Sequence, residues 1–163
     1  MRHTISILVE NEFGVLARIA GLFSGRGYNI DSLTVSPTLD TTVSRMTIVA
    51  QGNERVIEQI LKQLNRLINV ITVEDLTPHS FVERELILIK VRREASTHSE
   101  LLKQVELFGG RIIDDEEATY MLEFTGDESA LAKILDALKP YGILEFVSSG
   151  SIAIAQGMHR LEE

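Results

Sequence analysis

The feature that most constrains the fold is a change of apolar spacing within residues 1–40. Residues 3–9 alternate, with Ile5, Ile7 and Val9 on one side, which predicts a half-buried strand. From Gly14 the spacing becomes helical, because apolar residues recur at positions 15, 19, 22 and 23. Glycines at 25 and 27 end this helix, and residues 28–37 predict a second strand with a bulge or a late start. The chain therefore begins with a β-α-β unit.

The turn before this helix could hold a small anion. A helix start leaves backbone N–H groups unpaired, and Gly14 has no side chain to keep a ligand from the backbone. The amide of Asn11 can both donate and accept hydrogen bonds, and Asn29 could approach the same helix end of a neighbouring subunit. The carboxylate and ammonium groups of an α-amino acid fit such donors and acceptors. From spacing alone, however, a helix cap with ordinary turn residues is the favoured interpretation.

The later part of the chain repeats this order of elements. A strand at 43–50, a helix from 54 and a strand at 70–74 complete a βαββαβ unit, and the polar stretch 77–80 is the best domain boundary. Strands and helices of the same order and length follow at 86–91, 99–108, 111–114, 119–125, 127–139 and 143–147, with 151–155 extending the last strand or forming a ninth. The prediction is an α+β fold of two consecutive ferredoxin-like βαββαβ sandwiches, residues 1–77 and 78–163.

Two helices can cover only one face of a four-stranded sheet. The other face must then be polar or be covered by a partner. Residues 86–89, Leu-Ile-Leu-Ile, are apolar on both faces of their predicted strand, which is typical of an interface. We therefore expect a homo-oligomer, and a two-fold homodimer is the commonest form.

Composition excludes several classes of protein. The net charge is −8: residues 1–76 carry 7 basic and 8 acidic side chains, a net of −1, and residues 77–163 carry 9 and 16, a net of −7. Such a chain repels phosphate backbones, so we expect no nucleic-acid partner. No apolar run approaches the ~18 residues that span a bilayer, and residues 1–12 do not resemble a secretory signal. We expect a cytoplasmic protein without membrane association.

No catalytic constellation or metal site is predicted. There is no cysteine, and no nucleotide-binding glycine motif or serine nucleophile elbow occurs. The acidic run 114–117 is interpreted as a solvated turn. The four histidines lie far apart in the predicted elements, without a His or carboxylate neighbour at helical ligand spacing: His3, His79, His98 and His159.

Four short segments resemble one known family. Residues 8–16 (LVENEFGVL), 27–35 (GYNIDSLTV), 44–48 (SRMTI) and 82–86 (VEREL) are similar to the regulatory, or small, subunits of bacterial acetolactate synthase, also called acetohydroxyacid synthase. The first unit resembles an ACT domain, a module that senses amino acids. The resemblance is strongest in the first half of the chain and looser in the second.

The resemblance implies a function without chemistry in this chain. A regulatory subunit binds and activates a catalytic large subunit, which carries thiamine diphosphate, Mg²⁺ and FAD, and confers feedback inhibition by a branched-chain amino acid, usually valine. In the family the effector lies between two ACT domains of a dimer. By resemblance, one domain contributes Asn11, Gly14 and the Val15 amide, and the other contributes Asn29 and Ile30.

Two alternatives stay open at this point. A free-standing ACT module could regulate another protein, such as a transporter or a transcription factor, and co-purification with a thiamine-diphosphate enzyme would separate it from a regulatory subunit. A small metal-dependent enzyme is the weaker alternative, because no catalytic constellation supports it.

Overall fold

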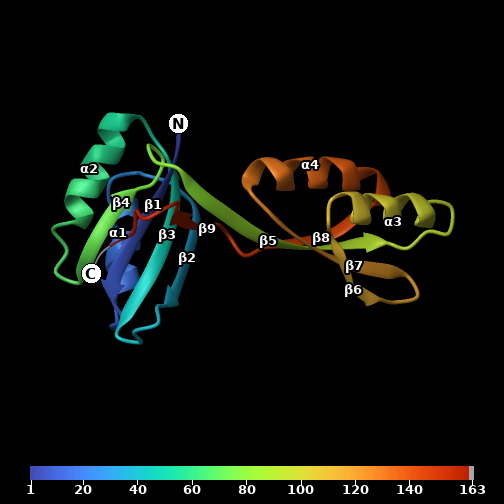
Figure 1. Ribbon diagram of the computed structural model, residues 1–163, viewed down its shortest axis with the longest axis horizontal. Coiled ribbons are helices and arrows are strands. Elements are labelled where there is room, and N and C mark those ends of the chain that lie inside the picture. The colour runs from blue at the N-terminus through green and yellow to red at the C-terminus, as the bar shows by residue number, and fades with distance from the viewer. Residues whose placement is uncertain (162–163) are drawn as a thin grey trace. The chain divides into compact units, whose positions relative to one another are not determined.

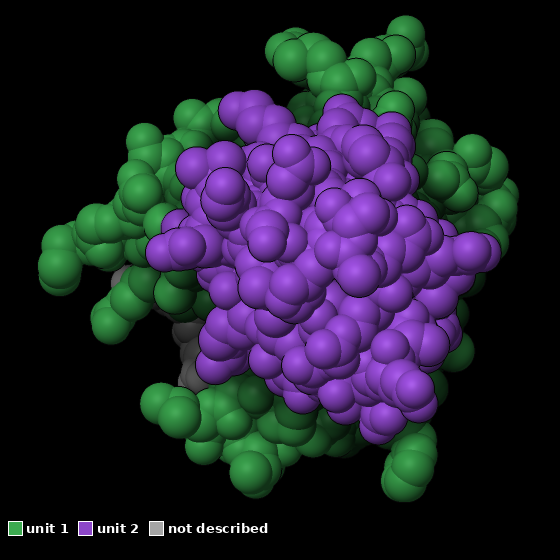
Figure 2. Space-filling view, turned by 90° about the vertical axis from the view of Figure 1, so that its right-hand side faces the viewer, with its two compact units in different colours: residues 1–83, 151–163 green, residues 84–150 purple. Residues whose placement is uncertain are grey.

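The computed structural model describes residues 1–161, which form two compact units. The first unit comprises residues 1–83 together with the C-terminal segment from Ser151, and the second comprises residues 84–150 (Figures 1 and 2). No helix among residues 1–161 has the length and apolar character needed to cross a membrane.

The first unit is a four-stranded antiparallel sheet covered on one face by two helices (Figure 1). The strand order is β2-β3-β1-β4. Residues of alternate positions in β1 and β3, such as Ile5, Ile7 and Ile48, pack with Ile19 and Ile60 of the helices into one core. The elements are β1 (Arg2–Glu10), α1 (Val15–Ser24), β2 (Ile30–Pro37), β3 (Val43–Gln51), α2 (Glu54–Leu64) and β4 (Val70–Asp75).

The second unit has the same topology, with strand order β6-β7-β5-β8. Its helices pack on Ile87 and Ile89 of β5 and on Leu122 and Phe124 of β7. The elements are β5 (Phe81–Arg92), α3 (His98–Leu107), β6 (Arg111–Asp115), β7 (Thr119–Gly126), α4 (Glu128–Leu138), the short 3-10 helix η1 (Lys139–Tyr141) and β8 (Ile143–Ser148). The predicted fold, two ferredoxin-like βαββαβ units, is confirmed.

The division of the chain differs from the predicted boundary between residues 77 and 78. The units separate at 83/84 and again at 150/151, because the last residues return to the first unit. They form a separate strand, β9 (Ile152–Ala155), which pairs with β5, and just beyond the two strands the Gln156 N–H donates to the Ser80 carbonyl (2.9 Å). Strand β2 combines both predicted irregularities: it starts at Ile30 and its register shifts before Ser32.

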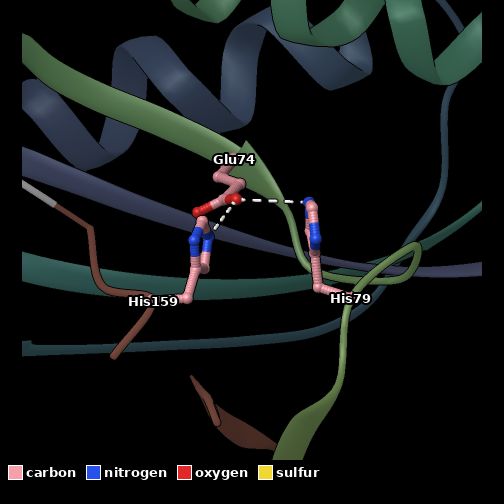
Figure 3. A group of neighbouring side chains, drawn as sticks. All are labelled: Glu74, His79 and His159. Atoms are coloured by element: carbon pink, nitrogen blue, oxygen red, sulfur yellow. Dashed lines mark hydrogen bonds and ion pairs between the residues drawn. The ribbon is translucent and has the colours of Figure 1, made fainter. Parts of the chain in front are cut away.

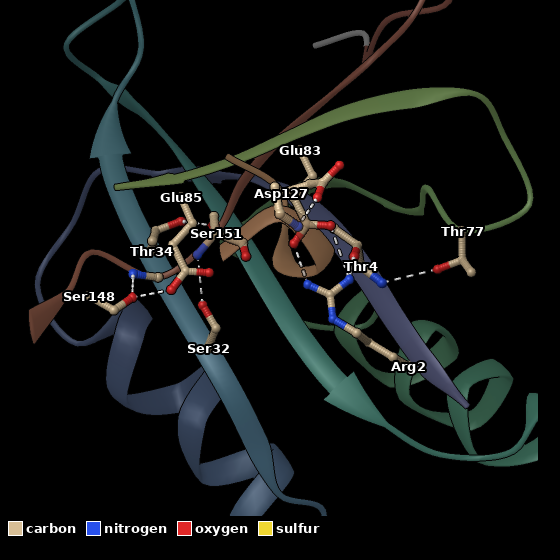
Figure 4. A network of polar contacts seen from close by, with 12 residues as sticks. Arg2, Thr4, Ser32, Thr34, Thr77, Glu83, Glu85, Asp127, Ser148 and Ser151 are labelled. Atoms are coloured by element: carbon tan, nitrogen blue, oxygen red, sulfur yellow. Dashed lines mark hydrogen bonds and ion pairs between the residues drawn. The ribbon is translucent and has the colours of Figure 1, made fainter. Parts of the chain in front are cut away.

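This returning segment, the strap (residues 151–161), covers the sheet face that the helices leave open. The Ser151 N–H donates to Ser32 Oγ (3.0 Å), and Thr34 Oγ1 donates to the Ser151 carbonyl (2.8 Å) (Figure 4). Arg45 Nη2 donates to the Ala153 carbonyl (3.2 Å). The face below contains apolar residues that are almost fully buried, including Leu8 (5% exposed) and Val49 (2%). In the first unit the open face is thus covered by the chain itself and not by a partner, and much of it is polar, as expected, since Thr4, Ser6 and Thr47 lie on it beside Leu8 and Val49.

The corresponding face of the second unit stays open. Leu86 and Val147 are 37% and 53% exposed, and ion pairs flank them, between Lys90 and Glu145 (2.9 Å) and between Arg111 and Glu123. Residues 86–89 are therefore apolar on a solvent-facing side, as the sequence predicts.

Candidate functional site

The turn between β1 and α1 leaves the start of the helix uncapped. Gly14 occupies the position before the first helical residue with φ 82°, a left-handed conformation that favours glycine, and no side chain caps the helix. The first helical bond runs from the Arg18 N–H to the Gly14 carbonyl, 3.0 Å, so the N–H groups of residues 15–17 precede it. The Val15 side chain is buried in the core, and only its backbone is available to a ligand.

Asn11 lies beside a hollow at this end of the sheet. Its N–H donates to the Thr42 carbonyl (2.7 Å) and its Nδ2 donates to the Thr41 carbonyl (2.9 Å), which joins the turn to the β2–β3 loop. The hollow has a volume of about 490 Å³, and Glu10, Asn11 and Glu12 are among the residues that line it. The carboxylates of Glu10 and Glu12 favour a cation in this hollow, and the N–H groups at the start of α1 favour an anion.

Asp40 stabilises the loop that Asn11 contacts. Its Oδ1 accepts hydrogen bonds from the Thr42 hydroxyl (2.7 Å) and the Thr42 N–H (2.8 Å). These bonds, the hydroxyl one first, hold the pKa of the Asp40 carboxyl below its ordinary value. The carboxylate form that accepts them therefore persists at neutral pH.

Asn69 connects the turn to helix α1, and sequence analysis did not predict this role. Its Nδ2 donates to Glu10 Oε2 (2.6 Å) and Glu12 Oε2 (3.3 Å), its Oδ1 accepts from Arg18 Nη1, and its carbonyl accepts from the Glu10 N–H (2.9 Å). The residue is only 8% exposed. A single asparagine in the α2–β4 connection carries no pattern that predicts partners nearly 60 residues away.

The other two predicted site residues lie at the opposite end of helix α1. Ile30 begins β2 and packs against the core, and the exposed Asn29 side chain donates from Nδ2 to Asp31 Oδ1 (3.0 Å). The ten residues of α1 rise about 15 Å, so one chain does not bring Asn29 and Ile30 to Gly14. Asn11, Gly14 and Val15 share one turn by sequence, while Asn29 and Ile30 lie at the far end of α1 in the same chain.

Two family models match this chain, one for each unit. A model described as the AHAS small subunit-like ACT domain matches residues 5–72, and a model described as the small subunit of acetolactate synthase matches residues 84–157. The chain belongs to the acetolactate synthase small-subunit family. Its first unit is an ACT domain.

Relatives of similar length support this membership. The chain is 46% identical to a probable acetolactate synthase small subunit of Archaeoglobus fulgidus, over 96% of this chain and 98% of that protein. It is 43% identical to the acetolactate synthase isozyme 3 small subunit of Salmonella typhimurium, over 96% and 97%. The crystal structure of the acetolactate synthase small subunit from Thermotoga maritima superposes with a TM-score of 0.88 at 35% identity, covering 96% of this chain and 98% of that one.

In this ACT domain we expect Asn69→Ala to loosen the first turn. The change removes hydrogen bonds to Glu10, Glu12 and Arg18 and should lower the free energy of unfolding by about 1–2 kcal/mol. Urea unfolding measures the loss. Asn65→Ala is the matched control, because Asn65 is exposed and its bond to the Leu61 carbonyl (3.0 Å) comes from the backbone N–H, which alanine keeps. Equal losses in the two variants would contradict the role given to Asn69.

The prediction that the histidines are isolated is wrong for three of them. His79, after β4, and His159, in the strap, lie together beside Glu74 of the same ACT domain (Figure 3). His3 also pairs with a carboxylate, Asp75 (2.7 Å). Local spacing could not predict these pairs, since the segments meet only after the strap has crossed the sheet. The acidic run 114–117 is exposed, and Asp115 within it pairs with Arg93.

Proposed function

We propose that this chain is the regulatory subunit of an acetolactate synthase. It binds a catalytic subunit, raises that subunit's activity and makes it sensitive to feedback inhibition by valine. The relatives are named as small subunits, which supports the existence of a larger partner. In this proposal the chain performs no chemistry itself: thiamine diphosphate, Mg²⁺ and FAD are held by the catalytic subunit, in the cytoplasm.

The first turn of the ACT domain is the observation that carries the proposal. Valine would place its carboxylate at the N–H groups that follow Gly14 and its ammonium group toward Asn11 and the carboxylates of the adjacent hollow. Helix N–H groups bind anions well because the helix dipole adds to the hydrogen bonds. The isopropyl group then points outward, where a second surface is needed to enclose it.

We infer that a second copy of the chain supplies this surface, through Asn29 and Ile30. Their position at the far end of α1 means that only another chain could bring such residues to Gly14. Exposed apolar side chains on the loops at the Gly14 end, Phe13, Leu39 and Ile68, are typical of a surface that meets another chain. Light scattering is expected to give twice the 18.2 kDa chain mass.

Regulation then follows from linkage between the effector and the partner. Valine can change the activity of the catalytic subunit only if it binds one arrangement of the dimer better than another. A coupling free energy of about 1–3 kcal/mol between the two binding events corresponds to a 5- to 150-fold change in affinity. By reciprocity the catalytic subunit must change the affinity for valine by the same factor.

Thermal unfolding with added amino acids tests the effector site. Valine at about 100 times its Kd adds about 2.7 kcal/mol, which should raise Tm by roughly 5–10 °C. D-valine is the matched control ligand, since it carries the same groups with the opposite handedness. The shift should be lost in Asn11→Ala. A valine shift that survives this change would place the effector elsewhere.

Co-purification tests the partner. A tagged version of this chain should retain a thiamine-diphosphate enzyme from its own cells, and the purified pair should form acetolactate from pyruvate faster than the catalytic subunit alone. Retention of a transporter or transcription factor in its place would favour the free-standing sensor.

A further inference from the structure

The strap crosses the whole open face of the ACT-domain sheet. It contacts β2 through Ser151, β3 through Ala153 and β4 through His159, and these strands lie in the sheet order β2-β3-β1-β4. The contacts at the first two points are backbone hydrogen bonds to side chains of the sheet. The contact at the last point is made by side chains alone, and it involves three groups that can bind a metal ion.

Glu74, His79 and His159 converge at this last point (Figure 3). Glu74 Oε1 lies 2.6 Å from His159 Nε2 and 3.4 Å from His79 Nε2, and one ligand atom from each residue lies within 4.8 Å of the others. The two imidazole rings stack with centroids 5.0 Å apart and an interplanar angle of 24°. Their side chains are about half exposed, so the cluster is open to solvent on one side.

We propose that Glu74, His79 and His159 form a binding site for a divalent transition-metal ion, with Zn²⁺ as the best match. Two imidazole nitrogens and one carboxylate oxygen are a usual protein ligand set for Zn²⁺, with water in the fourth position. Ligand atoms about 2.1 Å from a tetrahedral ion lie about 3.4 Å from one another. The Glu74–His79 distance already has this value, and the Glu74–His159 pair needs to open by less than about 1 Å.

The chemistry of the donors excludes the commoner hard cations. Mg²⁺ and Ca²⁺ prefer oxygen ligands, whereas two of these three ligands are imidazoles. An imidazole binds the ion only through an unprotonated nitrogen, so Zn²⁺ replaces the hydrogen bond between His159 Nε2 and Glu74, and each ring keeps its remaining proton on Nδ1. Binding is therefore weaker at pH 5 than at pH 8. The charge of Arg45 also acts on Glu74 and opposes the ion, so the affinity is lower than for an isolated ligand set.

A bound ion would fasten the end of the strap to the sheet. Its three ligands come from β4, from the β4–β5 connection and from the strap, segments that hydrogen bonds and ring stacking join here. This assignment does not depend on the proposed effector site, which involves other residues at the first turn.

Titration of the full-length, chelator-treated protein with Zn²⁺ alone tests the site. Calorimetry at pH 8 is expected to show one Zn²⁺ per chain, and Co²⁺ in its place should give the visible absorption of a tetrahedral ion. His159→Asn and Glu74→Gln should each weaken Zn²⁺ binding about tenfold or more, since even outer partners of a metal site contribute that much. Mg²⁺ should not compete.

His98→Asn is the matched control, because it removes a histidine of the other unit that interacts with Tyr120 and should leave Zn²⁺ binding unchanged. Circular dichroism verifies that each variant is folded. No saturable Zn²⁺ binding, or equal affinity in His159→Asn, His98→Asn and the parent protein, would overturn the proposal. The cluster would then be a hydrogen-bonded clamp without a metal.

Discussion

Gly14→Asp is expected to abolish valine inhibition of the reconstituted holoenzyme while leaving activation of the catalytic subunit largely intact. An added Cβ at Gly14 meets nothing within 4 Å, so the aspartate side chain has room. Its carboxylate would occupy the place proposed for the valine carboxylate and repel it. The left-handed backbone, φ 82°, adds about 1 kcal/mol of strain, too little to unfold the unit.

The second unit provides a control with the same backbone strain. Gly109 has φ 65°, and a Cβ there also meets nothing within 4 Å, so Gly109→Asp carries the same strain and the same added charge. It should keep the parent concentration of valine for half-maximal inhibition. Gly14→Asp and Gly109→Asp are compared in one assay of acetolactate formation at increasing concentrations of valine. Normal inhibition of Gly14→Asp would show that the first turn does not bind the effector.

Removal of the strap after Gly150 is expected to destabilise the ACT domain strongly. The cut exposes Leu8 and Val49 and removes the hydrogen bonds that Ser151 and Ala153 make to β2 and β3. Fully burying one such side chain contributes about 1.5–3 kcal/mol, so the loss should be about 3 kcal/mol or more, seen as a fall in Tm of roughly 10 °C.

A shorter cut after Gln156 separates the strand from the end of the strap. It keeps β9 and its contacts but removes His159. In the presence of a chelator, the Tm values of the two truncated proteins should differ by most of the fall in Tm predicted for the cut after Gly150. If both proteins melt at the same temperature, β9 is not what closes the sheet face.

Local patterns predicted the elements of both units well. Strand β1 and helix α1 were recognisable because their apolar residues recur with periods of 2 and 3.6, and the glycines at 25 and 27 mark where the helix ends. The same spacing defined the second unit despite its weaker resemblance to the family. Local signals thus specify the elements and their order, while the sheet order β2-β3-β1-β4 pairs β1 with strands distant in sequence.

Contacts between distant segments were not predictable in this way. The apolar residues Leu8 and Val49 face away from the helices, so another segment must cover them. Local spacing did not identify the strap as that segment. Residues 151–155 were recognised as a strand, but an isolated short strand carries no information about which sheet face it will cross. The Asn69 contacts and the pairing of His79 with His159 were missed for the same reason.

The effector site is predicted only in part. Asn11, Gly14 and Val15 lie within five consecutive residues, so the chemistry of Asn11 and Gly14 could be inferred from the turn itself, and the Val15 amide was added by resemblance to the family. Asn29 was proposed from its position at the start of the second strand and Ile30 by resemblance, and within one chain both lie at the other end of α1. Their role depends on a second subunit.

The return of the strap also has a consequence for biosynthesis. Residues 152–155, which cover the open face of the ACT-domain sheet, leave the ribosome after the entire second unit has been made. Domains usually fold in order from the N-terminus during synthesis. Here the N-terminal domain must wait with apolar residues of one sheet face uncovered, and the second unit can complete its fold first. A nascent chain paused before residue 150 is therefore the stage at which this protein is most exposed to aggregation and to chaperones.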